Sequence, residues 1–329
     1  MLDWLFGAKK EDAGGQGGAK PKPKSKGKAA APKAPPAAAP VKLRKVNIER
    51  KYAVVGEIGQ GSMSKVYRAV DNENGRVVCL KVQDKPKTTA AQARTRAPDR
   101  PTEGEIGQKI HHPHVVRTYD FGLTSKGQYY IVMEFIEGVS LNFVRQSGCE
   151  LARKVELLAQ AAEGLAAVHA KGFMHHDYGP KNLLVSRDDE IKLIDFGLAV
   201  PNTPAYRRPG NRTGTLQYMA PELVRRESID EKIDIFSWGV TAFELLTGKL
   251  PYDATEPMQM IRQRINSDPM DIGQVMPTLP DDLAQIIRLA LSRRPDKRWP
   301  HAATLPAALR GLPCAAGYKR NNAEERPYD

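Results

Sequence analysis

Two acidic motifs close together in the sequence carry residue types that suit phosphate chemistry. Residues 173–182 include Asp177 and Asn182, and Asp195 follows thirteen residues after the asparagine. Carboxylate and amide oxygens are preferred ligands of hard divalent cations such as Mg²⁺. A metal held by such oxygens, together with a fixed lysine, stabilises the negative charge that spreads over a migrating phosphoryl group. The pattern therefore indicates a site for phosphoryl transfer.

A glycine-bearing hairpin and a lysine-bearing strand precede these motifs. Residues 54–67 form a β-rich run that is broken by Gly59 and Gly61. Glycine allows the backbone to approach a phosphate closely and to present N–H groups to it. Residues 76–82 alternate in the manner of a strand and carry Lys81. Both segments are expected to contribute to the same phosphate site.

The second half of the chain adds three motifs, at residues 214–222, 232–240 and 294–299. With the motifs above they run in one order from about Tyr52 to about Leu312. In content and order they resemble the protein serine/threonine kinase family of the eukaryotic-like (Hanks) type, and specifically a bacterial member. The resemblance implies an ATP- and Mg²⁺-dependent enzyme that phosphorylates Ser or Thr hydroxyls of a protein substrate.

The resemblance also implies an α+β fold with two lobes. A small β-rich N-lobe is expected at about residues 51–136 and a larger helical C-lobe at about 137–312. Residues 313–329 are expected to form a short C-terminal tail. The hydrophobic periodicity predicts further elements in the C-lobe, with helices at 151–171, 231–247, 258–266 and 281–291 and strands at 183–185 and 191–194.

Each candidate catalytic residue receives a role from the resemblance. Asp177 is expected to be the catalytic base, and Asn182 and Asp195 are expected to hold Mg²⁺, with Mn²⁺ as a second option. Lys81 is expected to hold the α and β phosphates and to pair with a glutamate of the next helix. Glu103 and Glu105 are both candidates for this glutamate, and the family spacing favours Glu103.

The nucleotide would lie between the two lobes. Met133 is expected to gate the pocket behind adenine. Leu184 is expected to form the floor under adenine, and Cys79 stands in place of the family alanine that roofs adenine. The complete set of expected nucleotide contacts is Ile58, Gly59, Gly61, Ser62, Val66, Cys79, Lys81, Met133, Glu134, Ile136 and Leu184.

The segment around Asp177 departs from the family pattern at two positions. The family lysine that neutralises the γ-phosphate is Gly179 here, and we expect Lys181 to replace it. The family arginine before the catalytic Asp, which meets a phosphate on the activation segment, is His176. Its replacement indicates activation without such a phosphate, although a partly protonated histidine could still bind one. Another departure is Ser64 in place of the third glycine, expected at the loop tip.

The helix that carries Glu103 contains Gly104 and Gly107, each of which costs about 1 kcal/mol relative to Ala in a helix interior. Residues 85–101 before it are basic and loop-like. The family has a bulky apolar residue at the position of Gly107. We therefore expect a mobile helix whose inward position depends on a ligand or a partner.

Further roles concern the C-lobe. Thr215 is expected to contact the catalytic residues, Asp234 to accept backbone N–H groups of the catalytic loop, and Arg298 to pair with Glu222. Candidate autophosphorylation sites are Thr203, Thr213 and, as the poorest of the three, Thr215. The basic residues 206–212 favour acidic or phosphorylated substrates.

Three alternatives remain open. A pseudokinase or scaffold would bind nucleotide and partners with little turnover, which Gly179 and the glycine-broken helix favour. A small-molecule phosphotransferase would share the fold, but such relatives generally lack a segment like residues 214–222. A nucleic-acid tether would use the basic tail.

The composition sets the tail apart from the rest of the chain. Of the net charge of +12, residues 1–50 contribute +8, from twelve Lys/Arg and four Asp/Glu. This Lys/Pro/Ala-rich stretch cannot bury a core and is expected to be disordered, either as a solvated tether or in contact with an anionic partner. The chain has no apolar run long enough for a membrane span. Residues 1–7 lack the features of a signal peptide. The three cysteines fit a reducing cytoplasm.

Overall fold

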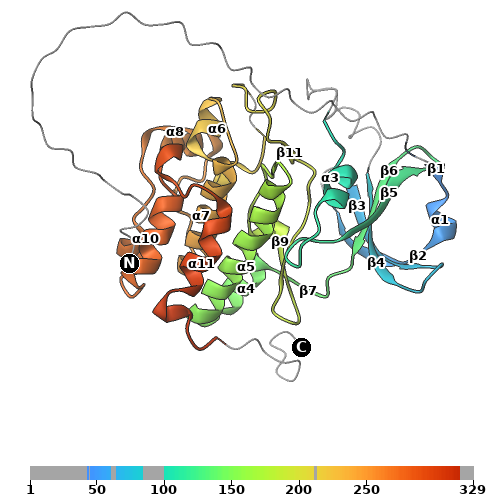
Figure 1. Ribbon diagram of the computed structural model, residues 1–329, viewed down its shortest axis with the longest axis horizontal. Helices are drawn as coiled ribbons and strands as arrows, with labels where there is room; N and C mark the ends of the chain where they lie inside the picture. The colour runs from blue at the N-terminus through green and yellow to red at the C-terminus, as the bar shows by residue number, and fades with distance from the viewer. Residues whose placement is uncertain (1–42, 44, 61–63, 84–99, 211–212, 319–329) are drawn as a thin grey trace, which may run out of the picture. The chain divides into compact units, whose positions relative to one another are not determined.

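The computed structural model describes residues 43, 45–60, 64–83, 100–210 and 213–318. These residues belong to the compact unit that spans Val41–Asp329. The unit contains a β-rich N-lobe and a helical C-lobe (Figure 1), which confirms the predicted α+β, two-lobed class. Among the described residues, no helix combines the length and the apolar character needed to cross a membrane.

The N-lobe is built on one six-stranded sheet in the order β1-β5-β6-β4-β3-β2. All neighbours are antiparallel except β1 and β5, which run parallel. Alternate residues of the strands face one side and bury a core of Tyr52, Ala69, Val78, Leu80, Tyr130 and Val132. The strands are β1 (Lys45–Val46), β2 (Tyr52–Gln60), β3 (Ser64–Asp71), β4 (Val77–Gln83), β5 (Thr118–Thr124) and β6 (Tyr129–Glu134).

The start of the described chain is ordered, in contrast to the expected disordered tail up to residue 50. β1 and the short helix α1 (Ile48–Lys51) lie within that stretch. Ser125 N–H donates to the Val46 carbonyl at 2.9 Å, and Lys126 pairs with Glu49 at 2.7 Å. Pairing with β5, a contact distant in sequence, therefore orders residues whose composition suggests a tail. The remainder of the predicted tail, up to residue 42, lies outside the described residues.

Helix α3 (Glu103–Lys109) is a complete short helix despite its glycines. The side chains of Thr102 and Glu105 form a reciprocal capping box at its start. A Cβ atom at Gly104 would lie 2.4 Å from the Phe121 ring, and one at Gly107 would lie 2.3 Å from Thr118 Oγ1. The glycines therefore allow α3 to lie close against β5, and Thr118 occupies space next to the position where the family has a bulky side chain.

The C-lobe is organised around α7, whose residues from Ile233 to Leu246 are all buried. Figure 1 shows α5 alongside α7. The predicted helices and strands are confirmed to within about one residue, and Gly172 follows α5 with φ +75°. The helices are α4 (Leu141–Ser147), α5 (Leu151–Ala170), α6 (Pro221–Arg225), α7 (Lys232–Thr247), α8 (Pro257–Asn266), α9 (Ile272–Val275), α10 (Asp281–Ala290) and α11 (Leu305–Arg310).

Two small sheets position the catalytic segments. One has the order β10-β9-β7 and the other pairs β11 with β8. Short 3₁₀ turns complete the lobe, and η6 after Leu312 continues the packing against α5. These elements are β7 (Gly138–Ser140), β8 (Phe173–Met174), β9 (Leu183–Ser186), β10 (Ile191–Leu193), β11 (Val200–Pro201), η2 (Pro180–Asn182), η3 (Leu216–Tyr218), η4 (Pro295–Lys297), η5 (Ala302–Thr304) and η6 (Pro313–Ala315).

The end of the described chain also remains attached to the C-lobe. The Tyr318 hydroxyl donates to Asp189 Oδ2 in a short hydrogen bond, and Arg153 forms a bidentate ion pair with the same carboxylate. Ordered contacts therefore extend six residues beyond the expected boundary at Leu312.

Candidate active site

Lys81 of β4 forms the ion pair that the sequence predicted with α3. Its Nζ lies 2.7 Å from Glu103 Oε1 and 3.1 Å from Asp195 Oδ1. Burial alone would lower the pKa of Lys81, but the charges of Glu103 and Asp195 outweigh burial and raise it. Lys81 is therefore protonated and links the sheet, α3 and the turn after β10. Glu105, the second candidate, accepts the Thr102 N–H at 2.7 Å instead.

A residue that the sequence analysis missed supports this pair. Gln83 Nε2 donates to Glu103 Oε2 at 3.2 Å. Gln83 lies two positions after Lys81 on the same strand, so the period of two places both side chains on one face. That periodicity was a sequence signal that could have identified Gln83.

Asp195 lies in a tight turn in the left-handed region, with φ 65°. Its Oδ1 accepts the Gly197 N–H at 2.9 Å. Burial opposes ionisation of this carboxyl, but Lys81 and the Gly197 N–H outweigh burial and lower its pKa to about 2. Asp195 is therefore ionised at neutral pH, and its side chain is 42% exposed.

The catalytic loop is fixed from below by Asp234 of α7, as predicted. Its carboxylate accepts the backbone N–H groups of His175 and His176 at 2.7 and 2.9 Å and contacts His169 Nε2 at 2.9 Å. A second predicted contact, the pair of Arg298 with Glu222, is bidentate at 2.6 and 2.7 Å and buried. These contacts hold the loop and the end of the activation segment on α7.

Lys181, the residue expected to replace the missing family lysine, contacts Asp177 and Thr215. Its Nζ lies 2.8 Å from Asp177 Oδ2 and 2.8 Å from Thr215 Oγ1. Thr215 in turn donates to Asp177 Oδ1 from its hydroxyl at 2.6 Å and from its N–H at 3.0 Å. The Lys181 side chain is 50% exposed, whereas that of Asp177 is 13% exposed.

Gly179, where the family lysine would be, lies against the Tyr218 ring. A Cβ atom at Gly179 would be 3.4 Å from Tyr218 Cδ2, an ordinary contact. The Tyr218 hydroxyl donates to Glu244 Oε2 at 2.7 Å. The backbone of Gly179 is extended, with φ 176°, so this position accepts other residues without backbone strain.

His176 differs from the expectation that a partly protonated ring could bind a phosphate. The side chain is 4% exposed, and burial lowers its pKa to about 4. Its Nδ1 lies 3.2 Å from the Thr213 hydroxyl. Because the ring is neutral near pH 7, it offers no cation to a phosphate, and that part of the prediction is wrong.

Several predicted nucleotide contacts lie side by side on the sheet. Val66 pairs with Gly59 on β2 and with Lys81 on β4, and Cys79 pairs with Met133 on β6. Burial raises the pKa of Cys79 to about 11. Its thiol is therefore protonated, in agreement with the interpretation of Cys79 as a small apolar residue.

The edges of this surface include exposed apolar groups. The Ile58 side chain is 51% exposed beside Gly59, and Leu184 of β9 is partly exposed. Glu134 donates its N–H to the Arg117 carbonyl at 2.8 Å, and its carboxylate pairs with Lys192 at 3.0 Å. Ile136 follows in the connection from β6 to β7.

Three positions of the glycine-rich hairpin need separate mention. Gly61 and Ser62 lie outside the described residues. Ser64 begins β3 and is buried, instead of lying at the loop tip as expected. Strand pairing with Gln83 places it there.

Asn182 and Asp195 fit a hard divalent cation by their chemistry. The amide nitrogen of Asn182 donates to the Asp177 carbonyl at 2.8 Å and to Asp177 Oδ2 at 3.3 Å. The amide oxygen therefore points away from Asp177. In the described part of the chain, no group of three His, Cys, Asp or Glu forms a metal cluster. A cation here would take its remaining ligands from phosphate and water, as Mg²⁺ commonly does.

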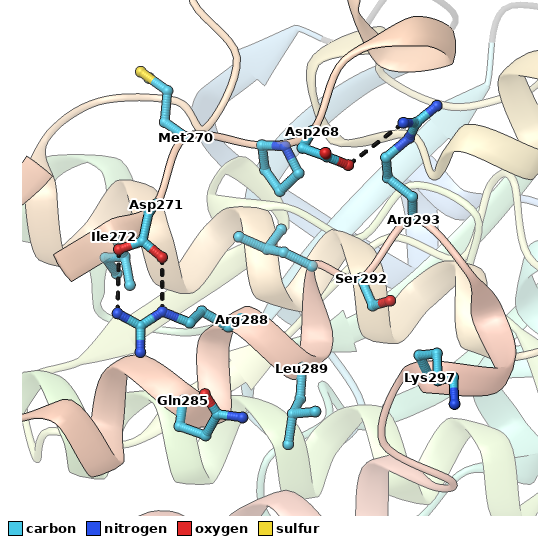
Figure 2. A pocket seen from close by; sticks show the side chains of 12 residues that line it. Asp268, Met270, Asp271, Ile272, Gln285, Arg288, Leu289, Ser292, Arg293 and Lys297 are labelled. Atoms are coloured by element: carbon cyan, nitrogen blue, oxygen red, sulfur yellow. Dashed lines mark hydrogen bonds and ion pairs between the residues drawn. The ribbon is translucent and has the colours of Figure 1, made fainter. Parts of the chain in front are cut away.

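A hollow of about 440 Å³ lies elsewhere in the C-lobe. Figure 2 shows side chains that line it. Asp271 accepts hydrogen bonds from Arg288 at 2.8 and 3.1 Å, and Arg293 contacts Asp268 at 3.4 Å. The hollow contains none of the predicted site residues. Because these arginines already have acidic partners, we assign it no role in catalysis.

Comparison with known proteins agrees with this geometry. The sequence pattern described as "Protein kinase domain" matches residues 52–307, and the chain therefore belongs to the protein kinase family. Its relatives include the bacterial "Serine/threonine-protein kinase PknB" of Mycolicibacterium smegmatis, which is 32% identical over 277 residues, or 80% of this chain and 43% of the relative.

Two further bacterial relatives show the same range. "Serine/threonine-protein kinase PknL" of Mycobacterium tuberculosis is 31% identical over 273 residues, covering 82% of this chain and 67% of the relative. "Probable serine/threonine-protein kinase pknA2" of Bifidobacterium longum is 30% identical over 254 residues, covering 76% and 33%. The match thus spans between one third and two thirds of the length of these three relatives.

Proposed function

We propose that this chain is an ATP- and Mg²⁺-dependent protein kinase that transfers the γ-phosphoryl group to Ser or Thr hydroxyls of proteins. The observation that carries the proposal is the contact set of Asp177. Its carboxylate meets Lys181, Thr215 and Asn182 within 3.3 Å, next to the assembled Lys81–Glu103 pair.

Each side chain has a separate task in this proposal. Asp177 orients the substrate hydroxyl and accepts its proton, and Lys81 holds the α and β phosphates. Asn182 and Asp195 hold Mg²⁺, which would neutralise charge on the phosphate oxygens when bound. Lys181 supplies the positive charge that the family takes from the position of Gly179.

Lys181 is suited to this task by charge and by reach. A lysine ammonium is a compact charge on a flexible stem, and its contacts with Asp177 and Thr215 support a role near the substrate hydroxyl. The ion pair with Asp177 also keeps that carboxylate oriented before substrate binds. We infer that Lys181 steadies the γ-phosphate during in-line transfer.

The same contacts argue against a scaffold with little turnover. The two sequence features that favoured it were Gly179 and the glycine-broken helix. Lys181 offsets the first, and the close packing of α3 on β5 accounts for the second. We also propose a cytoplasmic location, because Cys79, Cys149 and Cys314 are all free and a reducing compartment suits free thiols.

Phosphate incorporation from labelled ATP with Mg²⁺ tests the function. The wild-type chain and Asp195→Ala would be compared on casein, a generic protein acceptor, with acid hydrolysis to identify the modified residue. Incorporation on Ser or Thr by the wild type alone supports the proposal. If the wild type binds ATP but transfers no phosphate to casein or to itself, the scaffold explanation replaces it.

A further inference from the structure

Arg100 joins the chain ahead of α3 to the segment that follows Asp195. Its Nη2 donates to the Gly197 carbonyl at 2.5 Å, and its Nε donates to the Ala199 carbonyl at 3.2 Å. Burial lowers the pKa of this guanidinium, which nevertheless stays charged at neutral pH because arginine retains its proton in proteins. One side chain therefore fixes two carbonyls between the Asp195 turn and β11.

The position of Arg100 follows from its neighbours in the sequence. It lies two residues before Thr102, whose side chain begins the capping box of α3. A contact from Arg100 to Gly197 therefore connects the start of α3 with the turn that holds Asp195. The Lys81 ammonium makes a second link between α3 and this turn, because it contacts both Glu103 and Asp195.

The rest of the segment is held by backbone contacts and by side-chain contacts with charged groups, such as those of Asn202 with Glu231 and of Thr215 with Lys181 and Asp177. β11 pairs with β8, and Asn202 N–H donates to the Gly172 carbonyl at 2.7 Å. Further along, Gly214 has φ +126°, and a Cβ atom there would lie 2.4 Å from the His176 carbonyl. The segment thus returns directly onto the backbone of the catalytic loop.

His176 cannot supply a charge to this assembly. Its ring is buried and neutral, and the positive charge of Arg100 is one of the factors that lower its pKa. The Thr213 hydroxyl lies 3.2 Å from His176 Nδ1. A phosphate on that hydroxyl would therefore lie beside the neutral ring. Placing a dianion beside a buried neutral ring carries a desolvation penalty, and Arg100, the cation whose charge reaches this ring, already donates to two main-chain carbonyls.

We propose that Arg100 is a positioning residue that keeps residues 195–202 in the productive arrangement without a phosphate on the activation segment. The inference rests on the proposed kinase function. Arg100 acts through two main-chain carbonyls and touches no reacting group. It takes the place of a modification-dependent contact, so the enzyme is active as synthesised.

The first test uses the full-length chain after treatment with a protein phosphatase, with phosphorylation state verified by mass spectrometry. Transfer to casein should begin without a lag, and the double variant Thr203→Val/Thr213→Val should keep its rate to within about threefold of wild type. A lag that disappears as phosphate accumulates on either threonine would overturn the proposal.

The second test compares Arg100→Ala, Arg100→Gln and Arg100→Lys. Loss of both hydrogen bonds should lower kcat about 10- to 100-fold while the KM for ATP changes by less than about threefold. Lysine should restore only part of the rate, because it lacks the paired donors of a guanidinium. Equal rates in all three variants and the wild type would contradict a positioning role.

Hydrogen exchange gives a readout that is independent of activity. The amides of residues 197–202 should exchange faster in Arg100→Ala than in the wild type, with those of α7 unchanged. Unchanged exchange at 197–202 would overturn the inference. The outcomes separate the two proposals, because a wild-type chain without any transfer refutes the kinase function, whereas an active wild type with unaffected Arg100 variants refutes only the positioning role.

Discussion

The two sides of the candidate active site follow the family pattern to different degrees. On the N-lobe side, Lys81 and Glu103 are the residues that the family pattern predicts, at the expected positions and 2.7 Å apart. On the catalytic-loop side, the family lysine and arginine are absent, and Lys181 and His176 occupy the neighbouring or equivalent positions.

The difference follows from the surroundings of each group. Lys81 and Glu103 are almost fully buried, so a shift of either charge would leave its partner unpaired in a low-dielectric environment. Lys181 is half exposed, and a flexible, exposed side chain can approach one target from more than one backbone position. A buried ion pair thus fixes both position and residue type, whereas a solvent-facing charge needs only to reach its target.

The largest expected effect comes from the buried side of the comparison. Lys81→Met should lower kcat by about 10²- to 10³-fold, because a fixed charge that stabilises phosphate is lost. Steady-state transfer to casein measures the effect. Lys126→Met, at an exposed pair on the N-lobe surface, is the control and should retain the wild-type rate. A Lys81→Met enzyme with near-normal kcat would show that this pair serves only to hold the lobe together.

On the catalytic-loop side, the His176 environment predicts a loss of stability in acid. The native ring has a pKa of about 4, against 6.5 for the unperturbed group. The unfolded chain therefore binds a proton first, so stability from this group is complete above pH 6.5 and falls as the pH drops towards 4. The total loss is about 3 kcal/mol at most.

Urea unfolding between pH 7 and pH 4 measures this slope. Burial also lowers the pKa of His175 and His114, so the slope contains their contributions. In His176→Asn the slope should decrease, and asparagine tolerates the φ of 66° at this position. An identical slope in the variant would mean that His176 does not titrate as described.

The smallest effect concerns the close contact of α3 with β5. Gly107→Ala should destabilise the fold by about 1–3 kcal/mol, because a Cβ atom would lie 2.3 Å from Thr118 Oγ1. Thr118→Ala in the same chain should recover part of the loss. Gly56→Ala, where a Cβ atom meets nothing within 4 Å, is the matched control. Chemical denaturation would measure the free energy of unfolding of the wild type and the three variants. Equal stability of Gly107→Ala and Gly56→Ala would contradict the packing argument.

The sequence predicted those features that depend on local pattern or on a fixed order of motifs. The spacing around Asp177 and Asp195 identified the protein kinase family, and hydrophobic periodicity located α5 to within one residue. It predicted a helix at Glu103, and the dependence of that helix on a ligand or partner stays a prediction. It did not reveal that Gly104 and Gly107, poor helix formers in isolation, allow close contact with Phe121 and Thr118.

Contacts distant in sequence explain the other differences. β1 forms in a Lys-rich stretch because it pairs with β5, which no local pattern indicates. The neutral state of His176 depends on burial that only the fold reveals. Arg100 lies in a basic, loop-like stretch and shows no signal of its contacts to Gly197 and Ala199.

The central claim is that Lys181 supplies the charge missing at Gly179, and moving that charge tests it most directly. Casein phosphorylation would be compared for the wild type, Lys181→Glu and Gly179→Lys/Lys181→Glu. The account predicts that Lys181→Glu lowers kcat about 100-fold and that the double variant recovers most of the rate, because the lysine returns to the family position. A Lys181→Glu enzyme as active as the wild type would contradict the claim.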